Sequence, residues 1–228
     1  MNVRRWRTRA ATTVAATAVI TTAMSATTAS GAASTAPVQT RIEAGAHATA
    51  AARQQAGSAA LAGVDYRTWQ RDVAAVIGTA RPYIEQRTSA APSGRKLAIV
   101  LDIDNTSLET DFHFFWEYPT PAVKPVLDLA RYAHSRGVDV FFVTARPGIV
   151  QAPTAHNLRA VGYPVTGLYV RDLPDLFEEV SRYKTEKRGE IEAMGYTVIA
   201  NIGNRPTDLV GGHAEKTFKL PDYDGRLS

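Results

Sequence analysis

Short apolar runs alternate with segments of helical periodicity along the second part of the chain. The runs predict strands buried on both faces, and apolar residues recurring every three or four positions predict helices. The expected helices lie near residues 65–84, 121–135, 155–161 and 181–194, and the expected strands near 97–101, 138–144, 167–170, 196–202 and 216–220. Gly137, Gly162 and Gly195 end three of these helices, as expected of residues that tolerate a left-handed backbone.

This alternation predicts a doubly wound, mainly parallel α/β sheet with helices on both faces. Asp104, Thr144 and Lys184 are spaced 40 positions apart (144 − 104 and 184 − 144), and each interval is largely filled by one helix and one strand. No large cap domain is therefore expected. Ligand sites in such sheets lie at the carboxyl ends of the strands. The polar residues expected to meet there are Asp102, Asp104, Thr144, Asn204 and Asp208.

The first 63 residues lack the alternation. Four arginines within residues 4–9 precede an uncharged run of small and apolar residues, and further alanines follow, as in a secretory signal peptide. We expect a signal peptide over residues 1–33, an Ala-rich linker over 34–63 and one domain over 64–228, hence a secreted protein. The pair Arg4-Arg5 leaves both Sec and twin-arginine export open. The run is too weakly apolar for a stable membrane anchor.

The positive net charge of the chain comes from its first 36 residues. The formal charge is +4, yet residues 1–36 hold four arginines and no acidic residue, which leaves 26 − 4 = 22 basic against 22 acidic side chains. A neutral domain gives no reason to expect a nucleic-acid polymer as partner. The absence of cysteine excludes disulfides, thiolate metal sites and a cysteine nucleophile. No pattern in the sequence predicts an oligomeric state.

Two carboxylates follow the 97–101 strand, at Asp102 and Asp104. Such a pair is suited to holding Mg²⁺ through oxygen, and one aspartate could act as a nucleophile while the other acts as a general acid. The alternative is a calcium loop. An EF-hand needs Gly at its sixth and Glu at its twelfth position, but these are Ser107 and His113, so the calcium reading is disfavoured.

Three further residues could bind an anion at the same edge. Thr144 ends the second strand, Arg146 could fork onto a phosphate or a carboxylate, and Lys184 begins a helix. The alternatives are a strand-end threonine without a ligand and a charged run on a solvated helix face. Four aromatic residues after the first strand could form a wall over a substrate or pack onto the core: Phe112, Phe114, Phe115 and Trp116.

In this order the motifs resemble those of the haloacid dehalogenase superfamily of phosphohydrolases, over about residues 96–220. The matching segments are Asp102-Ile103-Asp104-Asn105-Thr106, Thr144, Lys184, and Gly203-Asn204 with Asp208. Three others look like the acid phosphatase branch, which includes plant vegetative storage proteins and secreted bacterial acid phosphatases. These are Phe142-Val143-Thr144-Ala145-Arg146, Asn157-Leu158 with Gly162-Tyr163, and Tyr183-Lys184-Thr185-Glu186-Lys187-Arg188.

The resemblance implies a phosphomonoesterase that works through an aspartyl-phosphate intermediate on small-molecule substrates. Asp102 would be the nucleophile, and Asp104 would protonate the leaving alcohol and then activate water. Thr144 and Lys184 would hold the phosphoryl oxygens, with Arg146 nearby. The resemblance also implies Mg²⁺, bound by Asp102, the main-chain carbonyl of Asp104, Asn204 and Asp208.

One position departs from the family pattern. Asn204 stands where an aspartate is usual, so either Asp208 compensates as the carboxylate ligand or metal affinity falls. Two alternatives to a general secreted acid phosphatase therefore stay open. One is a lipid- or nucleotide-selective phosphatase of the same fold, and the other is a catalytically weak binding or storage protein.

Overall fold

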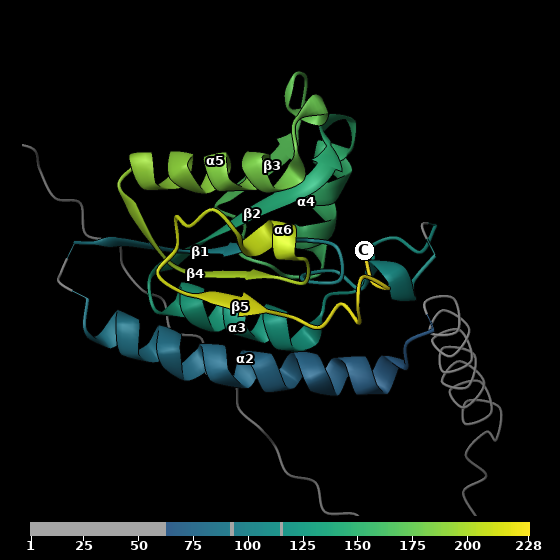
Figure 1. Cartoon of the computed structure of the whole chain (residues 1–228). Helices are drawn as coiled ribbons and strands as arrows, with labels where there is room; N and C mark the ends of the chain where they lie inside the picture. The colour runs from purple at the N-terminus through teal and green to yellow at the C-terminus, as the bar shows by residue number, and fades with distance from the viewer. Residues whose placement is uncertain (1–62, 92–93, 115) are drawn as a thin grey trace, which may run out of the picture.

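The computed structural model describes residues 63–91, 94–114 and 116–228. The predicted signal peptide (residues 1–33), the predicted linker up to residue 62 and Phe115 lie outside the described residues. A five-stranded sheet in the order β3-β2-β1-β4-β5 forms the centre (Figure 1). Its strands are β1 (Lys96–Leu101), β2 (Val138–Pro147), β3 (Gly167–Arg171), β4 (Tyr196–Gly203) and β5 (Thr217–Lys219). Every neighbouring pair is parallel, which confirms the predicted fold class.

Helices cover both faces of this sheet. The helices are α2 (Tyr66–Ser89), α3 (Lys124–Ser135), α4 (Gln151–Ala160), α5 (Val180–Ala193) and the short α6 (Pro206–Leu209). Three 3-10 turns lie between them: η1 (Thr110–Phe112), η2 (Gly148–Val150) and η3 (Asp175–Phe177). Figure 1 shows α5 on one side of the sheet and α2 and α3 on the other. In the described residues, the connections hold only these turns and no cap domain.

Strand β1 is buried on both faces, as its continuous apolar run predicts. Successive strand residues point to opposite faces. Leu97, Ile99 and Leu101 join the larger hydrophobic core with α2 and α3. Ala98 and Val100 join the smaller core, which includes side chains of α5. The central strand is thus held from both sides, and the turn that begins at residue 102 starts from a fixed position.

Helix α2 packs against α3, β4 and β5 on the outside of the molecule. Asp65 accepts a hydrogen bond from the amide of Thr68 at 2.7 Å and caps the first turn of the helix. The side chains at helical spacing that face inward are Trp69, Val73, Ile77, Ala80 and Ile84. Among the described helices, none combines the length and apolar character needed to cross a bilayer.

Two predicted helix starts differ from the structure. Helix α3 begins at Lys124 instead of near residue 121, because Ala122 is still paired with Leu108 in an isolated bridge. Helix α4 begins at Gln151, four residues before the predicted start. Its Pro153 lies in the first helical turn, where a missing amide hydrogen costs no hydrogen bond. Residues 151–154 have no apolar residues at helical spacing, so the sequence pattern did not predict this first turn.

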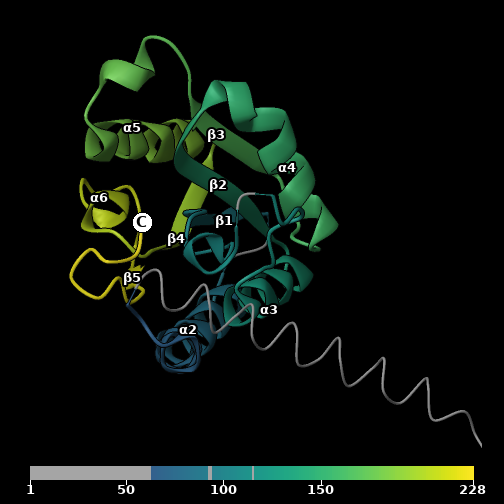
Figure 2. The ribbon, with the colours of Figure 1, turned by 90° about the vertical axis from the view of Figure 1, so that its right-hand side faces the viewer.

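The carboxyl ends of the strands meet at one edge, which faces the viewer in Figure 2. The final residues of the chain return to this edge, where Leu227 is buried. Five of the residues predicted to carry the chemistry lie on or just beyond these strand ends: Asp102, Asp104, Thr144, Arg146 and Asn204. The other two lie on helices, Lys184 on α5 and Asp208 on α6.

Candidate functional site

The turn after β1 sends two aspartates in different directions. The amide of Asp102 donates to the carbonyl of Ile202 in β4 at 3.0 Å, which extends the sheet by one bond. The chain then turns through Asn105, whose φ of 51° lies in the left-handed region that asparagine tolerates. Ser107 secures the turn by donating from its hydroxyl to the carbonyl of Asp102 at 2.6 Å.

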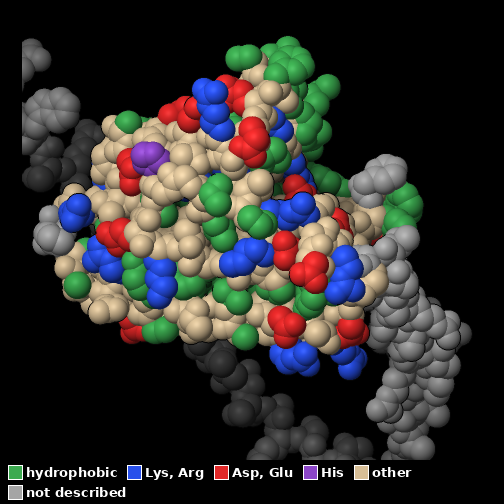
Figure 3. Space-filling view, in the orientation of Figure 1, with side chains coloured by type: hydrophobic (Ala, Val, Ile, Leu, Met, Phe, Trp, Pro, Cys, Tyr) green, Lys and Arg blue, Asp and Glu red, His purple; other side chains and the backbone are tan. Residues whose placement is uncertain are grey.

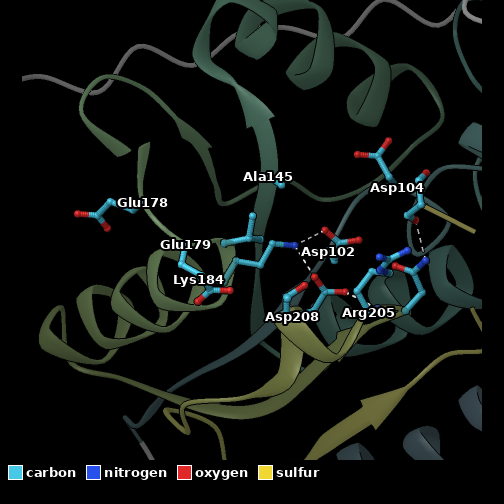
Figure 4. A pocket seen from close by; sticks show the side chains of 12 residues that line it. Asp102, Asp104, Ala145, Glu178, Glu179, Lys184, Arg205 and Asp208 are labelled. Atoms are coloured by element: carbon cyan, nitrogen blue, oxygen red, sulfur yellow. Dashed lines mark hydrogen bonds and ion pairs between the residues drawn. The ribbon is translucent and has the colours of Figure 1, made fainter. Parts of the chain in front are cut away.

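Lys184 lies between two carboxylates in the buried half of the site. Its Nζ is 2.6 Å from Oδ1 of Asp102 and 2.6 Å from Oδ1 of Asp208, and Figure 4 shows the amine directed at both. The three side chains are between 3% and 8% exposed. They come from the end of β1, the first turns of α5, and α6, so the sheet edge assembles three distant segments as predicted.

The turn between β4 and α6 brings Asp208 into this cluster. A Cβ on Gly203 would lie 2.4 Å from the Cβ of Asp208, so only glycine allows this approach. The amide of Arg205 donates to Oδ2 of Asp208 at 2.7 Å, which orients the carboxylate. Arg188, also buried, donates from Nη1 to the carbonyl of Asp208 at 2.9 Å.

Arg188 is a structural residue of the site that the sequence analysis did not identify. It sits in the charged run treated there as a possible solvated face. Its position four residues after Lys184 places both on one face of α5, and that spacing was the available signal.

The buried cluster carries an excess of negative charge. Burial raises the pKa of Asp102 to about 7; Lys184 opposes this, whereas the charges of Asp208 and Asp104 add to it. Burial would lower the pKa of Lys184, but the two carboxylates outweigh it and the pKa is raised. One ammonium therefore faces two buried carboxylates, and a further cation would stabilise the ionised form of Asp102.

Asp104 lies in a different environment, partly exposed and paired with Arg146. Nη2 of Arg146 is 2.7 Å from Oδ1 of Asp104, and Nε lies 3.2 and 3.1 Å from its two oxygens. The hydroxyl of Thr110 donates to Oδ1 at 2.8 Å. Burial would raise the pKa of Asp104, but the hydrogen bonds and charge of Arg146, with Thr110, lower it. No motif in the sequence marked Thr110 for this contact.

Arg146 and Thr144 have contacts within the protein that the sequence did not specify. The carboxylate partner of Arg146 is Asp104 of its own chain. Thr144 is buried, and its hydroxyl oxygen accepts from the amide of Arg146 at 3.2 Å. The neighbouring Ala145, rather than Thr144, lines the main cavity of the site.

That cavity measures about 660 Å³. Of the predicted site residues, it is lined by Asp102, Asp104, Lys184, Asn204 and Asp208. Asn204 is fully buried, with Oδ1 3.3 Å from the hydroxyl of Thr106 and Nδ2 donating to the carbonyl of Ser228 at 2.7 Å. Five of the seven predicted residues therefore share one cavity, with Arg146 joined to it through Asp104.

The donor set suits a hard divalent cation. In the part of the chain that the structure describes, no three acidic or histidine side chains converge on one metal position. The oxygens available are the carboxylates of Asp102 and Asp208 and the amide of Asn204. Mg²⁺ is commonly held by one or two carboxylates together with water and phosphate oxygens. Because the cluster is also short of positive charge, these residues fit such an ion.

The predicted aromatic wall divides into two parts. Phe112 is buried and stacks on Trp69 of α2 with ring centroids 4.3 Å apart, so it packs onto the core. Phe114 stacks on Trp116 at 4.5 Å, and Trp116 is 62% exposed. Neither interpretation of the aromatic run therefore holds for all of its described members.

The chain is similar to several known proteins. The chain is similar to the Stem 28 kDa glycoprotein of Glycine max (33% identity over 106 residues, 45% of this chain and 42% of the relative). It is also similar to Acid phosphatase 1 of Solanum lycopersicum (29% over 104 residues, 45% and 41%). The match thus spans about two fifths of these relatives' length.

A class C acid phosphatase from Bacillus anthracis shares the fold, with a TM-score of 0.57 at 18% identity over 75% of this chain and 84% of that one. The family model that matches covers residues 19–226, almost the whole sequence. The chain belongs to the HAD superfamily, subfamily IIIB (acid phosphatase).

Proposed function

We propose that the protein is a secreted, Mg²⁺-dependent acid phosphatase that hydrolyses small-molecule phosphomonoesters through an aspartyl-phosphate on Asp102. The observation that carries this proposal is the pairing of Asp102 with Lys184 and Asp208, beside a second, separately held carboxylate at Asp104. A nucleophile, a cation for the phosphoryl oxygens and an acid–base group thereby line one cavity.

Each residue has a distinct part in this reaction. Asp102 attacks phosphorus, and Lys184 stabilises the negative charge on the phosphoryl oxygens. Asp104 protonates the leaving oxygen and then, ionised, activates the water that hydrolyses the intermediate. The pair with Arg146 favours the ionised form that the second step needs. Protonation for the first step becomes easier as pH falls, which supports activity on the acid side of neutrality.

Mg²⁺ would be held by Asp102, the main-chain carbonyl of Asp104, Asn204 and Asp208. When bound, it supplies positive charge that keeps Asp102 ionised and neutralises the phosphate. Asp102 would then attack as a carboxylate, although burial raises its pKa to about 7 without such an ion.

Small phosphate esters are the substrates that the surface supports best. On the face seen in Figure 3, basic and acidic side chains are interspersed and do not gather into a field of one sign. A nucleic-acid polymer would call for a basic stripe. The proposal of secretion is supported by the start of the sequence, where four arginines precede an uncharged run of small and apolar residues. This segment lies outside the described residues.

Phosphate release tests the proposal directly. Purified protein should release phosphate from an aryl phosphate between about pH 5 and 7.5. EDTA should abolish the release and added Mg²⁺ should restore it. No release under any of these conditions would overturn the assignment as an enzyme, whereas release that EDTA leaves intact would overturn the metal dependence alone. A panel of lipid, nucleotide and sugar phosphates would separate a general from a selective phosphatase.

A second candidate, a catalytically weak binding or storage protein, is favoured by Asn204. The amide replaces a charged ligand, and its nitrogen already donates to the carbonyl of Ser228. If the wild-type protein is inert and Asn204→Asp gains Mg²⁺-dependent phosphate release, this candidate is preferred. If the wild-type protein turns over and Asn204→Asp changes only the Mg²⁺ requirement, it is rejected.

A further inference from the structure

His113 lies between two glutamates in the connection from β1 to α3. Its Nε2 is 3.1 Å from Oε2 of Glu109, and its Nδ1 is 2.8 Å from Oε2 of Glu117. The side chains are mostly buried, at 12% exposure for His113, 5% for Glu109 and 19% for Glu117. This cluster is outside the cavity that holds Asp102, and the proposed reaction does not use it.

The geometry favours a doubly protonated ring. An ionised carboxylate only accepts hydrogen bonds, and neutral imidazole has one donor nitrogen and one acceptor nitrogen. Both ring nitrogens of His113 face carboxylate oxygens, so with both carboxylates ionised the two contacts are satisfied only in the imidazolium form. In agreement, the hydrogen bond to Glu109 raises the pKa of His113; burial opposes this, and Glu117 adds to it.

Glu109 in turn is bound to helix α2. Tyr66 places its hydroxyl 2.9 and 3.0 Å from the two oxygens of Glu109, and Nε2 of Gln70 donates to Oε1 at 2.6 Å. The ring nitrogens of His113 thus face the carboxylates of Glu109 and Glu117, and the Tyr66 phenol lies behind Glu109. His113 therefore connects a carboxylate anchored on α2 to one further along the connection.

The same connection reaches the acid–base group of the site. Thr110, the residue after Glu109, donates to Oδ1 of Asp104 at 2.8 Å. The amide of Asp111 donates to Oδ1 of Asn105 at 3.0 Å, in the turn that carries Asp104. The path of the backbone at Glu109 thus decides where the Thr110 hydroxyl lies.

We propose that His113 is a positioning residue: as an imidazolium between Glu109 and Glu117, it holds the 109–117 segment so that Thr110 stays on Asp104. This inference rests on the proposed function. The pKa of His113 is higher in the folded protein than the ordinary histidine value of 6.5. Both contacts of the imidazolium, with Glu109 and with Glu117, are therefore fully present below pH 6.5 and are lost as pH rises through the pKa of the folded protein. Activity should therefore have an alkaline limit set by a residue outside the catalytic cavity.

The first test compares His113→Gln with His134→Gln, an exposed histidine on α3. His113→Gln should lower kcat by at most about 5-fold at acid pH, the loss expected when the Thr110 hydroxyl itself is removed, with little change in KM. It should also remove the step on the alkaline limb of the pH profile. The His134 variant should keep the wild-type profile. A His113→Gln enzyme with the wild-type profile overturns the inference.

A second test reads the ring without turnover and stands if His113→Gln does not fold. Imidazole nitrogen spectra of the wild-type protein should show that the His113 ring loses its second proton only above pH 6.5. Glu117→Gln, which removes the more exposed partner, should lower that titration point and move the alkaline limb of activity with it. A ring that titrates at or below 6.5 overturns the inference, whereas a wild-type protein that releases no phosphate overturns the proposed function as well.

Discussion

Asp102 and Asp104 are separated by one residue yet lie in opposite electrostatic environments. Burial raises the pKa of Asp102 to about 7, and Asp208, with which Asp102 shares Lys184, adds to the rise, although Lys184 opposes it. The pKa of Asp104 is lowered, because Arg146 outweighs the effect of burial. A pair of carboxylates whose affinities for protons are pushed apart is the arrangement expected of two groups with different roles.

The two halves of the site are also built differently. Asp102, Lys184 and Asp208 stand on the end of a strand and on two helices, so the sheet topology itself brings them together. Asp104 is held by Arg146 from the end of β2 and by Thr110 from an irregular connection. The positions of Asp102, Lys184 and Asp208, the buried half of the site, should therefore be insensitive to small changes elsewhere. The position of Asp104, in the acid–base half, should depend on the connection that carries Thr110.

The largest expected effect separates the two aspartates by role. Asp102→Asn removes the nucleophile without changing side-chain size, and phosphate release should fall by at least about 10⁴-fold with every substrate. The measurement is initial rates at saturating Mg²⁺. A matched melting curve should show that the variant is folded. A folded Asp102→Asn protein with wild-type rates would rule out the aspartyl-phosphate.

Asp104→Asn should depend on the leaving group where Asp102→Asn does not. Loss of a general acid should cost about 10² to 10⁴-fold with alkyl phosphates, whose alkoxide is a poor leaving group. The loss should be much smaller with 4-nitrophenyl phosphate, which needs little protonation. Rates of both variants on the two substrates measure the contrast. An equal loss on both substrates would show that Asp104 has no acid role.

Lys184→Met tests how the charges of the buried half compensate one another. Two carboxylates would be left without their cation, and the free energy of unfolding should fall by about 3 kcal/mol, measured by denaturant unfolding without metal. Adding Asp208→Asn to this variant should recover part of the loss, since one of the two charges is then removed. Lys124→Met is the control, because Lys124 is 77% exposed and pairs with Asp128 at the surface. Equal destabilisation by the two methionine variants would contradict the charge-balance account.

The buried half was the more predictable from sequence. Asp102 follows an apolar run and Asp208 follows a later strand, so their meeting is expected from periodicity and from the rule that strand ends meet. Lys184 lies near a helix start, and the family resemblance singled it out from its charged run. The fold class, the strands and the closing glycines followed from the same patterns. Arg188 was missed because a charged run does not reveal which of its members turns inward.

The acid–base half depends on contacts that periodicity does not encode. The 109–121 connection has no repeating pattern, so neither the contact of Thr110 with Asp104 nor that of His113 with two glutamates could be read from it. For Arg146, the sequence indicated the type of partner but not that it is Asp104. Such contacts require the path of the backbone, which only the packed structure supplies.

The smallest expected effect concerns Thr110 and tests whether the connection matters to Asp104. Thr110→Val keeps the shape of the side chain but removes the hydroxyl that donates at 2.8 Å, so kcat for an alkyl phosphate should fall by about 5-fold. Thr110→Ser keeps the hydroxyl and is the matched control, with a rate close to wild type. Because the hydrogen bond from Thr110 helps to lower the pKa of Asp104, its loss should raise that pKa. Wild-type rates for Thr110→Val would mean that Arg146 alone holds Asp104. The acid–base half of the site would then depend on the 109–121 connection no more than the buried half does.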